Sequence, residues 1–372
     1  MDEKLGVKFI RLLPQEYNLT DGHAYRDWSD AELSIIENSG EIFKSLNRQM
    51  QPRIEAEYIS QLLGMTGQTY DPSSVRYLIC MTGSESLDIV ANYLRLKRMS
   101  LTLIEPCYVG LADTFRRHEI DVKPFPDELL RAEDIDQRLG ELPTGSAICL
   151  VSPNNPTGRT LTAENMSKLL SLCSRKRILL IIDAAFRAYL PMSDIYDQYQ
   201  LLIESDVAFV VIEDTGKTWP TMELKGPIMA ISPAIYSDIL HIYADLILHV
   251  SPFTIGLLTE FLKLSERDQL AAVHGVVAQN RAAMQGAIDG TELQAKEEAF
   301  ASVSWLNTGS RSGAELVQDL EVAGVYILEG TRFYWSDPTR GTNFVRVSLV
   351  RSPPVFAEAC RRIRTVLKSR NY

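Results

Sequence analysis

The sequence predicts an α/β fold, in which a doubly wound and mostly parallel sheet forms a large domain that precedes a smaller α+β domain. Two observations support this prediction. Short runs such as VAFVVIED and RILLIIDAAF are apolar on both faces, which is typical of central parallel strands that helices cover on each side. Helical patterns separate these runs, as in alternating strand and helix units. We expect the strands at residues 76–81, 101–105, 147–152, 178–183, 207–213 and 227–231.

Amphipathic stretches between the expected strands predict helices. Residues 86–99 and 162–176 have helical periodicity, and the second stretch opens with a threonine cap and carries Glu164 in its first turn. From about residue 237 to 288 the pattern is helical throughout. This long helical region marks the passage from the large domain toward the small one.

The C-terminal part alternates again between strand and helix patterns. Strands are expected at residues 302–306 and 344–349 and a closing helix at 355–368, which together predict the α+β domain. The first thirty residues fit neither pattern and are expected to form an extended arm. The predicted organisation is therefore an arm, a large domain and a small domain at residues 1–30, 31–270 and 271–372.

The composition excludes several classes of protein. Apolar residues make up 45% of the chain and charged residues 23%, which is typical of a soluble globular protein. The net charge of −10 offers no basic surface for nucleic acid or for an anionic membrane. The five cysteines are far apart, and no histidine lies at metal-ligand spacing, so we expect reduced thiols and no metal. Because no apolar leader or membrane span is evident, we expect a cytoplasmic protein.

Polar and glycine-rich motifs follow the expected strands directly. Ligands collect at the carboxyl ends of the strands in open α/β sheets, so these motifs are expected to meet at one site. Each alone has an ordinary explanation as a turn, a helix cap or a solvated lysine. A phosphate-binding loop is excluded at residues 216–218, because Val211 stands where its first glycine is required. The motifs are TGSES (82–86), PCY (106–108), SPNNPTGR (152–159), DAAFR (183–187) and EDTGKTW (213–219).

Taken in this order, the motifs resemble those of fold-type I pyridoxal-phosphate (PLP) enzymes of the class I/II aminotransferase group, over nearly the whole chain. The resemblance implies that Lys217 forms the Schiff base with PLP and that Asp183 faces the pyridine nitrogen, where a carboxylate keeps the ring an electron sink. It also implies that Asn155 donates to the phenolate oxygen and that Tyr108 stacks on the ring, although Tyr108 alone could equally be a core aromatic residue.

The resemblance also assigns the phosphate and the substrate carboxylate. Backbone N–H groups of Gly83 and Ser84 at a helix start are expected to hold the phosphate. Lys225 stands where the family usually has a phosphate-binding arginine, so the charge is kept and the two-pronged fork is lost. Arg346 matches the C-terminal arginine that grips the substrate α-carboxylate. A homodimer is expected from the resemblance alone.

Three features depart from an ordinary aminotransferase. Phe186 stands where a tyrosine usually donates to the phenolate oxygen. Asp214 replaces a serine that contacts the phosphate, so we expect Asp214 to point toward a cationic part of the substrate and Thr215 to supply the phosphate hydroxyl. The arm carries EYNLTDGHA over residues 16–24, which ordinary aminotransferases lack.

These departures resemble a narrower group, the PLP-dependent L-arginine oxidases of antibiotic pathways, which use O2 without a metal or flavin. The resemblance implies that the arm closes over the active site, that His23 is the catalytic histidine, and that Glu16 and Asp214 bind the guanidinium. Two carboxylates and one arginine suit a substrate with a cationic tail and an α-carboxylate. Glu16 could equally be a solvated residue of the arm.

The activity that this resemblance implies is oxidation of L-arginine with release of peroxide, in natural-product biosynthesis. The outcome is either 4-hydroxylation, giving 4-hydroxy-2-oxo-arginine, or desaturation, giving a dehydroarginine or 2-oxo product. An ordinary aminotransferase for arginine or another amino acid is the alternative, because it needs the same residues. A cofactor-binding regulatory module without catalysis is a third hypothesis, and lysine, ornithine or citrulline stay open as substrates.

Overall fold

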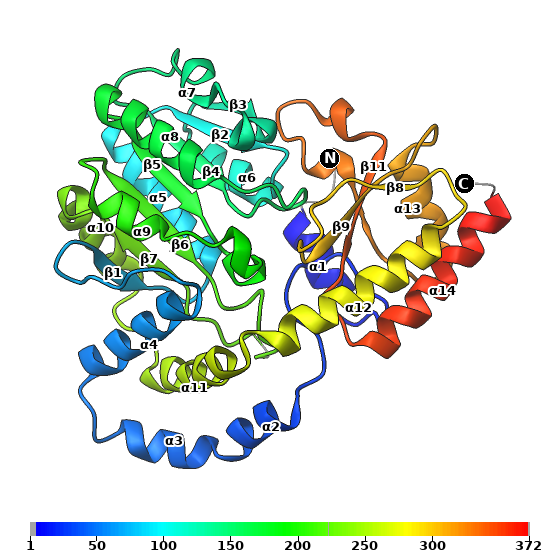
Figure 1. The fold of residues 1–372 in the computed structure, drawn as a ribbon, viewed down its shortest axis with the longest axis horizontal. Coiled ribbons are helices and arrows are strands. Elements are labelled where there is room, and N and C mark those ends of the chain that lie inside the picture. Colours follow the sequence, from blue (N-terminus) through cyan, green and yellow to red (C-terminus); the bar gives the residue numbers. More distant parts are fainter. Residues whose placement is uncertain (1–4, 222, 371–372) are drawn as a thin grey trace.

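Two β-sheets organise the chain in the computed structural model, which describes residues 5–221 and 223–370 (Figure 1). Within these residues the larger sheet has seven strands in the order β1-β7-β6-β5-β4-β2-β3. Neighbouring strands from β6 to β3 are parallel, whereas β7 is antiparallel to both β6 and β1. The predicted mostly parallel sheet is confirmed. Its strands are β1 (Arg76–Ile79), β2 (Leu101–Glu105), β3 (Val122–Pro126), β4 (Ala147–Val151), β5 (Leu179–Asp183), β6 (Phe209–Glu213) and β7 (Ile228–Ile231).

The six strands expected in this sheet are present to within two residues, but β3 was not predicted. Its sequence, VKPFP, carries two prolines and buries only Phe125, so it lacks the apolar run of the central strands. Proline is tolerated on edge strands, where one side of the backbone has no partner. Accordingly, β3 pairs only with β2, at the edge of the sheet.

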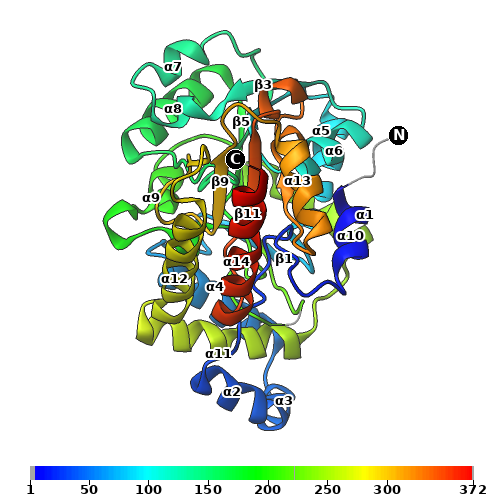
Figure 2. The same cartoon turned by 90° about the vertical axis from the view of Figure 1, so that its right-hand side faces the viewer.

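Helices cover the sheet on both faces. Helix α5 contacts α6 and α10, helix α8 contacts α7 and α9, and Figure 2 shows these two groups on opposite sides of the strands. Helix α5 begins after Thr82 and α8 after Thr162, and each threonine side chain accepts a hydrogen bond from a backbone N–H three residues on. The bounds are α5 (Gly83–Lys97), α6 (Val109–Arg117), α7 (Ile135–Arg138), α8 (Ala163–Lys176), α9 (Gln198–Ile203) and α10 (Pro233–Leu246).

The smaller sheet is antiparallel, with the order β10-β11-β9-β8 among the described residues. Helices α12 and α14 pack together, and α13 contacts β10, β11 and α14. The boundary expected between residues 270 and 271 falls in the turn between α11 and α12, and it stays a prediction. The elements are α11 (Pro252–Asp268), α12 (Ala271–Ile288), β8 (Gln294–Ala295), β9 (Val303–Asn307), α13 (Gly313–Val322), β10 (Leu328–Glu329), β11 (Phe344–Ser348) and α14 (Pro353–Arg370).

The arm differs from the expected extended segment, because residues 5–12 form helix α1 (Leu5–Leu12). The helix is stabilised by tertiary contacts: Leu12 is buried, and Lys8 Nζ lies 3.2 Å from a carboxylate oxygen of Glu321 on α13. After the arm come α2 (Asp30–Glu37), α3 (Ser39–Leu46) and α4 (Gln51–Met65), all of which contact α11. No helix of residues 5–221 and 223–370 is long and apolar enough to cross a membrane.

Candidate active site

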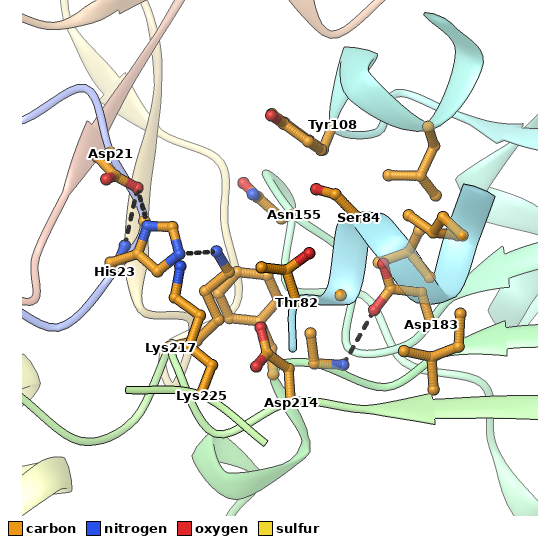
Figure 3. Close-up of a pocket in the computed structure, with 18 of the residues that line it drawn as sticks. Asp21, His23, Thr82, Ser84, Tyr108, Asn155, Asp183, Asp214, Lys217 and Lys225 are labelled. Atoms are coloured by element: carbon orange, nitrogen blue, oxygen red, sulfur yellow. Dashed lines mark hydrogen bonds and ion pairs between the residues drawn. The ribbon is translucent and has the colours of Figure 1, made fainter. Parts of the chain in front are cut away.

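A cavity of about 340 Å³ opens at the carboxyl ends of the parallel strands (Figure 3). The large domain, the small domain and the arm all contribute to its lining, so the motifs that lie far apart in the sequence meet here. Ten residues predicted to form the site line the cavity: His23, Gly83, Ser84, Tyr108, Asn155, Asp183, Asp214, Lys217, Lys225 and Arg346. Tyr108 and Asn155 lie near each other on one side of the cavity, and His23 faces Lys217 on the other.

Asp183 ends β5 and presents its carboxylate to the cavity. Burial raises the pKa of Asp183 to about 6, although the backbone N–H of Ala185 donates to Oδ1 at 3.1 Å. A cation at the carboxylate would favour its ionised form. Nearby, Oδ1 of Asn155 is buried and has no hydrogen-bond partner in the described part of the chain. Both groups therefore suit a polar ligand lying in the cavity.

The first turn of α5 forms one end of the cavity, where Thr82, Gly83 and Ser84 lie. Backbone N–H groups at the start of a helix lack partners within the helix and attract anions. Lys225 adds a positive charge, and its side chain packs so closely over Gly216 that a Cβ there would lie 2.9 Å from Lys225 Cε. Lys225 Nζ also pairs with Glu223. This end of the cavity is suited to a phosphate group.

Asp214 differs from its expected orientation. Its Oδ1 accepts a hydrogen bond from the backbone N–H of Gly216 at 3.0 Å, and its Oδ2 lies beside Gly83, 3.7 Å from where a Cβ would be. The carboxylate therefore reaches the helix-start end of the cavity rather than pointing away from it. Its contact with a cationic substrate tail stays a prediction.

Lys217 and His23 are in contact on one side of the cavity (Figure 3). Lys217 Nζ lies 3.0 Å from His23 Nε2, and His23 Nδ1 lies 2.6 Å from Asp21 Oδ1. Burial raises the pKa of Asp21, but the hydrogen bond from His23 and the charges of His23, Lys217 and Arg351 outweigh burial and lower that pKa well below its usual range. Asp21 is thus an ionised partner of the histidine.

The arm is fixed by its backbone to the small domain. The N–H of Leu19 donates to Tyr326 O at 2.8 Å, and the N–H of Ser348 donates to Leu19 O at 2.9 Å. The buried guanidinium of Arg351 donates to the carbonyls of Asn18, Asp21 and His23 at 2.8, 2.8 and 3.0 Å. These contacts place His23 in the cavity.

Arg346 on β11 is buried at the small-domain side of the cavity, with 1% of its surface exposed. Its Nη2 donates to Thr20 O at 2.6 Å, while Nε and Nη1 have no hydrogen-bond partner among residues 5–221 and 223–370. Burial lowers the pKa of Arg346 to about 10, so the group is still a cation near neutral pH. A buried cation with unused N–H groups is suited to binding a carboxylate.

Two predicted site residues do not line the cavity. Glu16 is exposed, and its side chain interacts with the Tyr17 hydroxyl. Thr215 is fully buried, and its hydroxyl accepts a hydrogen bond from the backbone N–H of Gly226 at 3.2 Å. Their predicted roles in binding guanidinium and phosphate are not supported by this placement and stay predictions.

Among the residues that line the cavity without having been assigned by sequence reasoning are Phe9, Asp21 and Thr82. Thr82 could have been found as a helix cap before the glycine, since threonine is a common cap. Asp21 lies two residues before His23, and the DGH run was the available signal. No sequence motif marks Phe9 as a site residue, because only the packing of α1 brings it to the cavity.

The residues present fit PLP. Asp183 provides a carboxylate for the ring nitrogen, Lys217 an amine for the aldehyde, and Asn155 a side-chain amide whose N–H2 group could donate to the phenolate oxygen. The start of α5 and Lys225 provide donors and charge for the phosphate. No group of three or more His, Cys, Asp or Glu side chains that could hold a metal occurs within the described residues.

Comparison with known proteins identifies the family. Residues 8–363 match the family described as aminotransferase class I and II. The structure of MppP soaked with the product 2-ketoarginine has a TM-score of 0.87 and 30% sequence identity, and the match covers 94% of this chain and 99% of that chain. A comparison with curated proteins finds no match.

Two more distant structures show the same fold. LysN, an α-aminoadipate aminotransferase from Thermus thermophilus, has a TM-score of 0.78 at 19% identity, covering 97% of this chain and 94% of that chain. The kynurenine aminotransferase of Pyrococcus horikoshii has a TM-score of 0.78 at 15% identity, covering 100% and 96%. The chain belongs to the class I and II aminotransferase family and is a PLP-dependent enzyme with the aminotransferase fold.

Proposed function

We propose that this enzyme oxidises L-arginine, with O2 as the electron acceptor and peroxide as a product. The observation that carries the proposal is the contact of 3.0 Å between Lys217 Nζ and His23 Nε2, in which a histidine from the N-terminal arm meets the lysine of the cofactor site. The similarity to MppP, whose structure was obtained with the product 2-ketoarginine, supports the same substrate class.

Arg346 orients the substrate in this proposal. Its free Nε and Nη1 groups would donate to the α-carboxylate, while Nη2 stays on Thr20 O. This arrangement would direct the Cα–H bond toward the amine of Lys217, which lines the same cavity. Asp214 and Glu16 stay candidates for the guanidinium from the resemblance alone, since Asp214 lies toward the start of α5 and Glu16 does not line the cavity.

Proton transfer would be shared by Lys217 and His23. The lysine amine removes the proton from Cα, and the histidine, in hydrogen-bond reach of that amine, accepts a proton or orients a water molecule. When bound, PLP supplies the electron sink for the pair left at Cα, and Asp183 holds the proton on the ring nitrogen. Each two-electron oxidation of the substrate would reduce one O2, with two protons, to one peroxide. Hydrolysis after one oxidation would give the 2-oxo product and ammonia, whereas 4-hydroxylation with oxygen from water, or desaturation, would need a second oxidation and a second O2.

The arm would also exclude water. Asp21, Gly22 and His23 line the cavity, and arm residues 18–22 are buried. The backbone of the arm lies close to the carboxylate-binding arginine, since a Cβ at Gly22 would be 3.7 Å from Arg346 Nη1. Exclusion of solvent protects reactive intermediates from premature hydrolysis. Whether hydroxylation or desaturation follows would depend on a water molecule held near His23.

The homodimer, the cytoplasmic location and the role in natural-product biosynthesis are further expectations from the resemblance.

Oxygen consumption tests the proposal directly. The PLP-loaded enzyme receives L-arginine without a keto acid, an oxygen electrode records uptake, and added catalase reveals peroxide by returning part of the oxygen. Uptake with peroxide release is the expected result, and mass spectrometry then separates hydroxylated from unsaturated products. No uptake, with conversion once a keto acid is added, would instead establish an aminotransferase, for which Lys217, Asp183 and Arg346 are equally suited.

A further inference from the structure

We infer that Asp21 is a positioning residue that holds His23 in one tautomer, with the proton on Nδ1 and the free electron pair of Nε2 directed at Lys217. The inference deepens the proposed function and rests on it for its catalytic meaning. The tautomer itself does not depend on the proposed function, because it is inferred from the hydrogen-bond partners of the two ring nitrogens of His23.

The first ring nitrogen has an acceptor as its partner. His23 Nδ1 lies 2.6 Å from Asp21 Oδ1, and the same oxygen accepts the backbone N–H of His23 at 3.0 Å. The side chain of Asp21 therefore binds both the backbone and the ring of the residue two positions on. An ionised carboxylate has no proton to donate, so the hydrogen in the ring contact belongs to Nδ1.

The second ring nitrogen faces a donor. Lys217 Nζ lies 3.0 Å from His23 Nε2. A neutral imidazole with its proton on Nδ1 must accept at Nε2, and a lysine amine or ammonium can donate there. The hydrogen bonds then run in one direction, from Lys217 to His23 to Asp21. The opposite tautomer would place an N–H against Lys217 and a lone pair against a carboxylate.

Asp21 is itself held from two sides. The Tyr25 hydroxyl lies 3.2 Å from Asp21 Oδ2 and 2.9 Å from Glu223 Oε1, and the backbone carbonyl of Asp21 accepts from Arg351 at 2.8 Å. Arg351 also donates to the carbonyl of His23 at 3.0 Å. Because these backbone contacts do not involve the Asp21 carboxylate, replacing the side chain should leave the path of the arm unchanged.

The test reads the tautomer directly. Nitrogen-15 NMR of protein labelled at its histidine rings, recorded at about pH 8, where free histidine is neutral, reports which ring nitrogen carries the proton. The cofactor-free protein, in which Lys217 has a free amine, tests the whole chain of hydrogen bonds, and the PLP-loaded enzyme tests the contact of Asp21 with Nδ1. The chain has five histidines, and His23→Gln identifies the signal of His23. The expected spectrum has the proton on Nδ1. A proton on Nε2 in the wild-type enzyme would overturn the inference, whatever any variant does.

Variants then assign the tautomer to Asp21. Serine at position 21 keeps a short oxygen for the backbone N–H but is too short to hold the ring, so Asp21→Ser should move the proton of His23 toward Nε2. Tyr25→Phe is the matched control, because it removes a contact to Oδ2 and spares Oδ1, and it should keep the wild-type tautomer. If Asp21→Ser retains the Nδ1 proton while folded, Asp21 does not set the tautomer.

Kinetics connect the tautomer to the proposed oxidation. Asp21→Ser should lower kcat for product formation by roughly a hundredfold, at the lower end of the range for general acid–base effects, because His23 itself remains. KM for L-arginine should stay nearly unchanged, since Arg346 is intact. The NMR result requires no turnover, so a confirmed tautomer in an enzyme that consumes no O2 would refute the proposed function alone. An altered tautomer with unchanged kcat would refute the positioning role.

Discussion

Replacing Arg346 with lysine is the sharpest test of substrate binding. The guanidinium is buried, and two of its three nitrogens have no hydrogen-bond partner in the described residues. Arg346→Lys keeps a positive charge but offers a single point donor in place of a fork. We expect binding of L-arginine to weaken because one charged hydrogen bond to the α-carboxylate is lost.

The magnitude follows from that single bond. A hydrogen bond to a charged group contributes about 1.5–3 kcal/mol, so the affinity should fall roughly 10- to 150-fold. Calorimetric titration of PLP-loaded enzyme without oxygen measures this change and avoids turnover. Agmatine, which is L-arginine without its α-carboxylate, is the matched ligand, and its affinity should be nearly the same for both enzymes.

The comparison of the two ligands decides the outcome. Equal weakening for L-arginine and agmatine would mean that Arg346 supports the fold of the site rather than the carboxylate. A change in affinity of less than about threefold for L-arginine, corresponding to under 1 kcal/mol, would mean that Arg346 does not bind the α-carboxylate through two hydrogen bonds. The absorbance of bound PLP and the thermal unfolding midpoint confirm that the variant is folded and loaded.

Four further results are expected. Lys217→Ala should abolish both turnover and the visible absorbance of the lysine-bound cofactor, and retained turnover would refute its assignment. His23→Ala should spare loss of the Cα proton, measured as exchange with deuterated solvent, but change the product ratio seen by mass spectrometry; an unchanged ratio would remove His23 from the later steps. Arg351→Met leaves three backbone carbonyls of the arm without their hydrogen-bond donor, so limited proteolysis near residues 13–24 should be faster than in the wild type. Equal cleavage rates would mean that Arg351 does not hold the arm in place. In the cofactor-free protein, burial raises the pKa of Asp183 from 3.8 to about 6, so ionisation of this group should lower the free energy of unfolding as pH rises through that interval. Urea denaturation at several pH values should show a smaller fall in the free energy of unfolding for Asp183→Asn than for the wild type. The same pH dependence in both proteins would contradict this prediction.

The sequence alone determined the sheet and the identity of the cofactor site. Strands such as β5 and β6 are apolar on both faces, and this local pattern is sufficient to place a buried parallel strand. Because parallel strands end at the same edge, Asp183 and Lys217 could be assigned to one site without knowing any distance. The ordered motifs then indicated the family, which the comparisons confirm.

Elements without such a local pattern were decided by tertiary structure. The edge strand β3 has prolines and little burial, so its sequence resembles a loop until β2 supplies the hydrogen bonds. Helix α1 is a single short segment of eight residues, and isolated helices of that length are unstable in water. Its position, and that of Phe9 in the cavity, depends on packing against the small domain.

Side-chain directions in the site also depended on distant contacts. The sequence indicated His23, but its place in the cavity depends on Arg351, more than 300 residues away in the chain, which donates to the backbone carbonyls of Asp21 and His23. Asp214 reaches the start of α5 because the Gly216 N–H fixes one of its oxygens, a turn detail that residue type does not encode. Periodicity and strand order are local properties that a sequence expresses directly, whereas the orientation of a charged side chain is set by whichever donors the completed fold brings within reach.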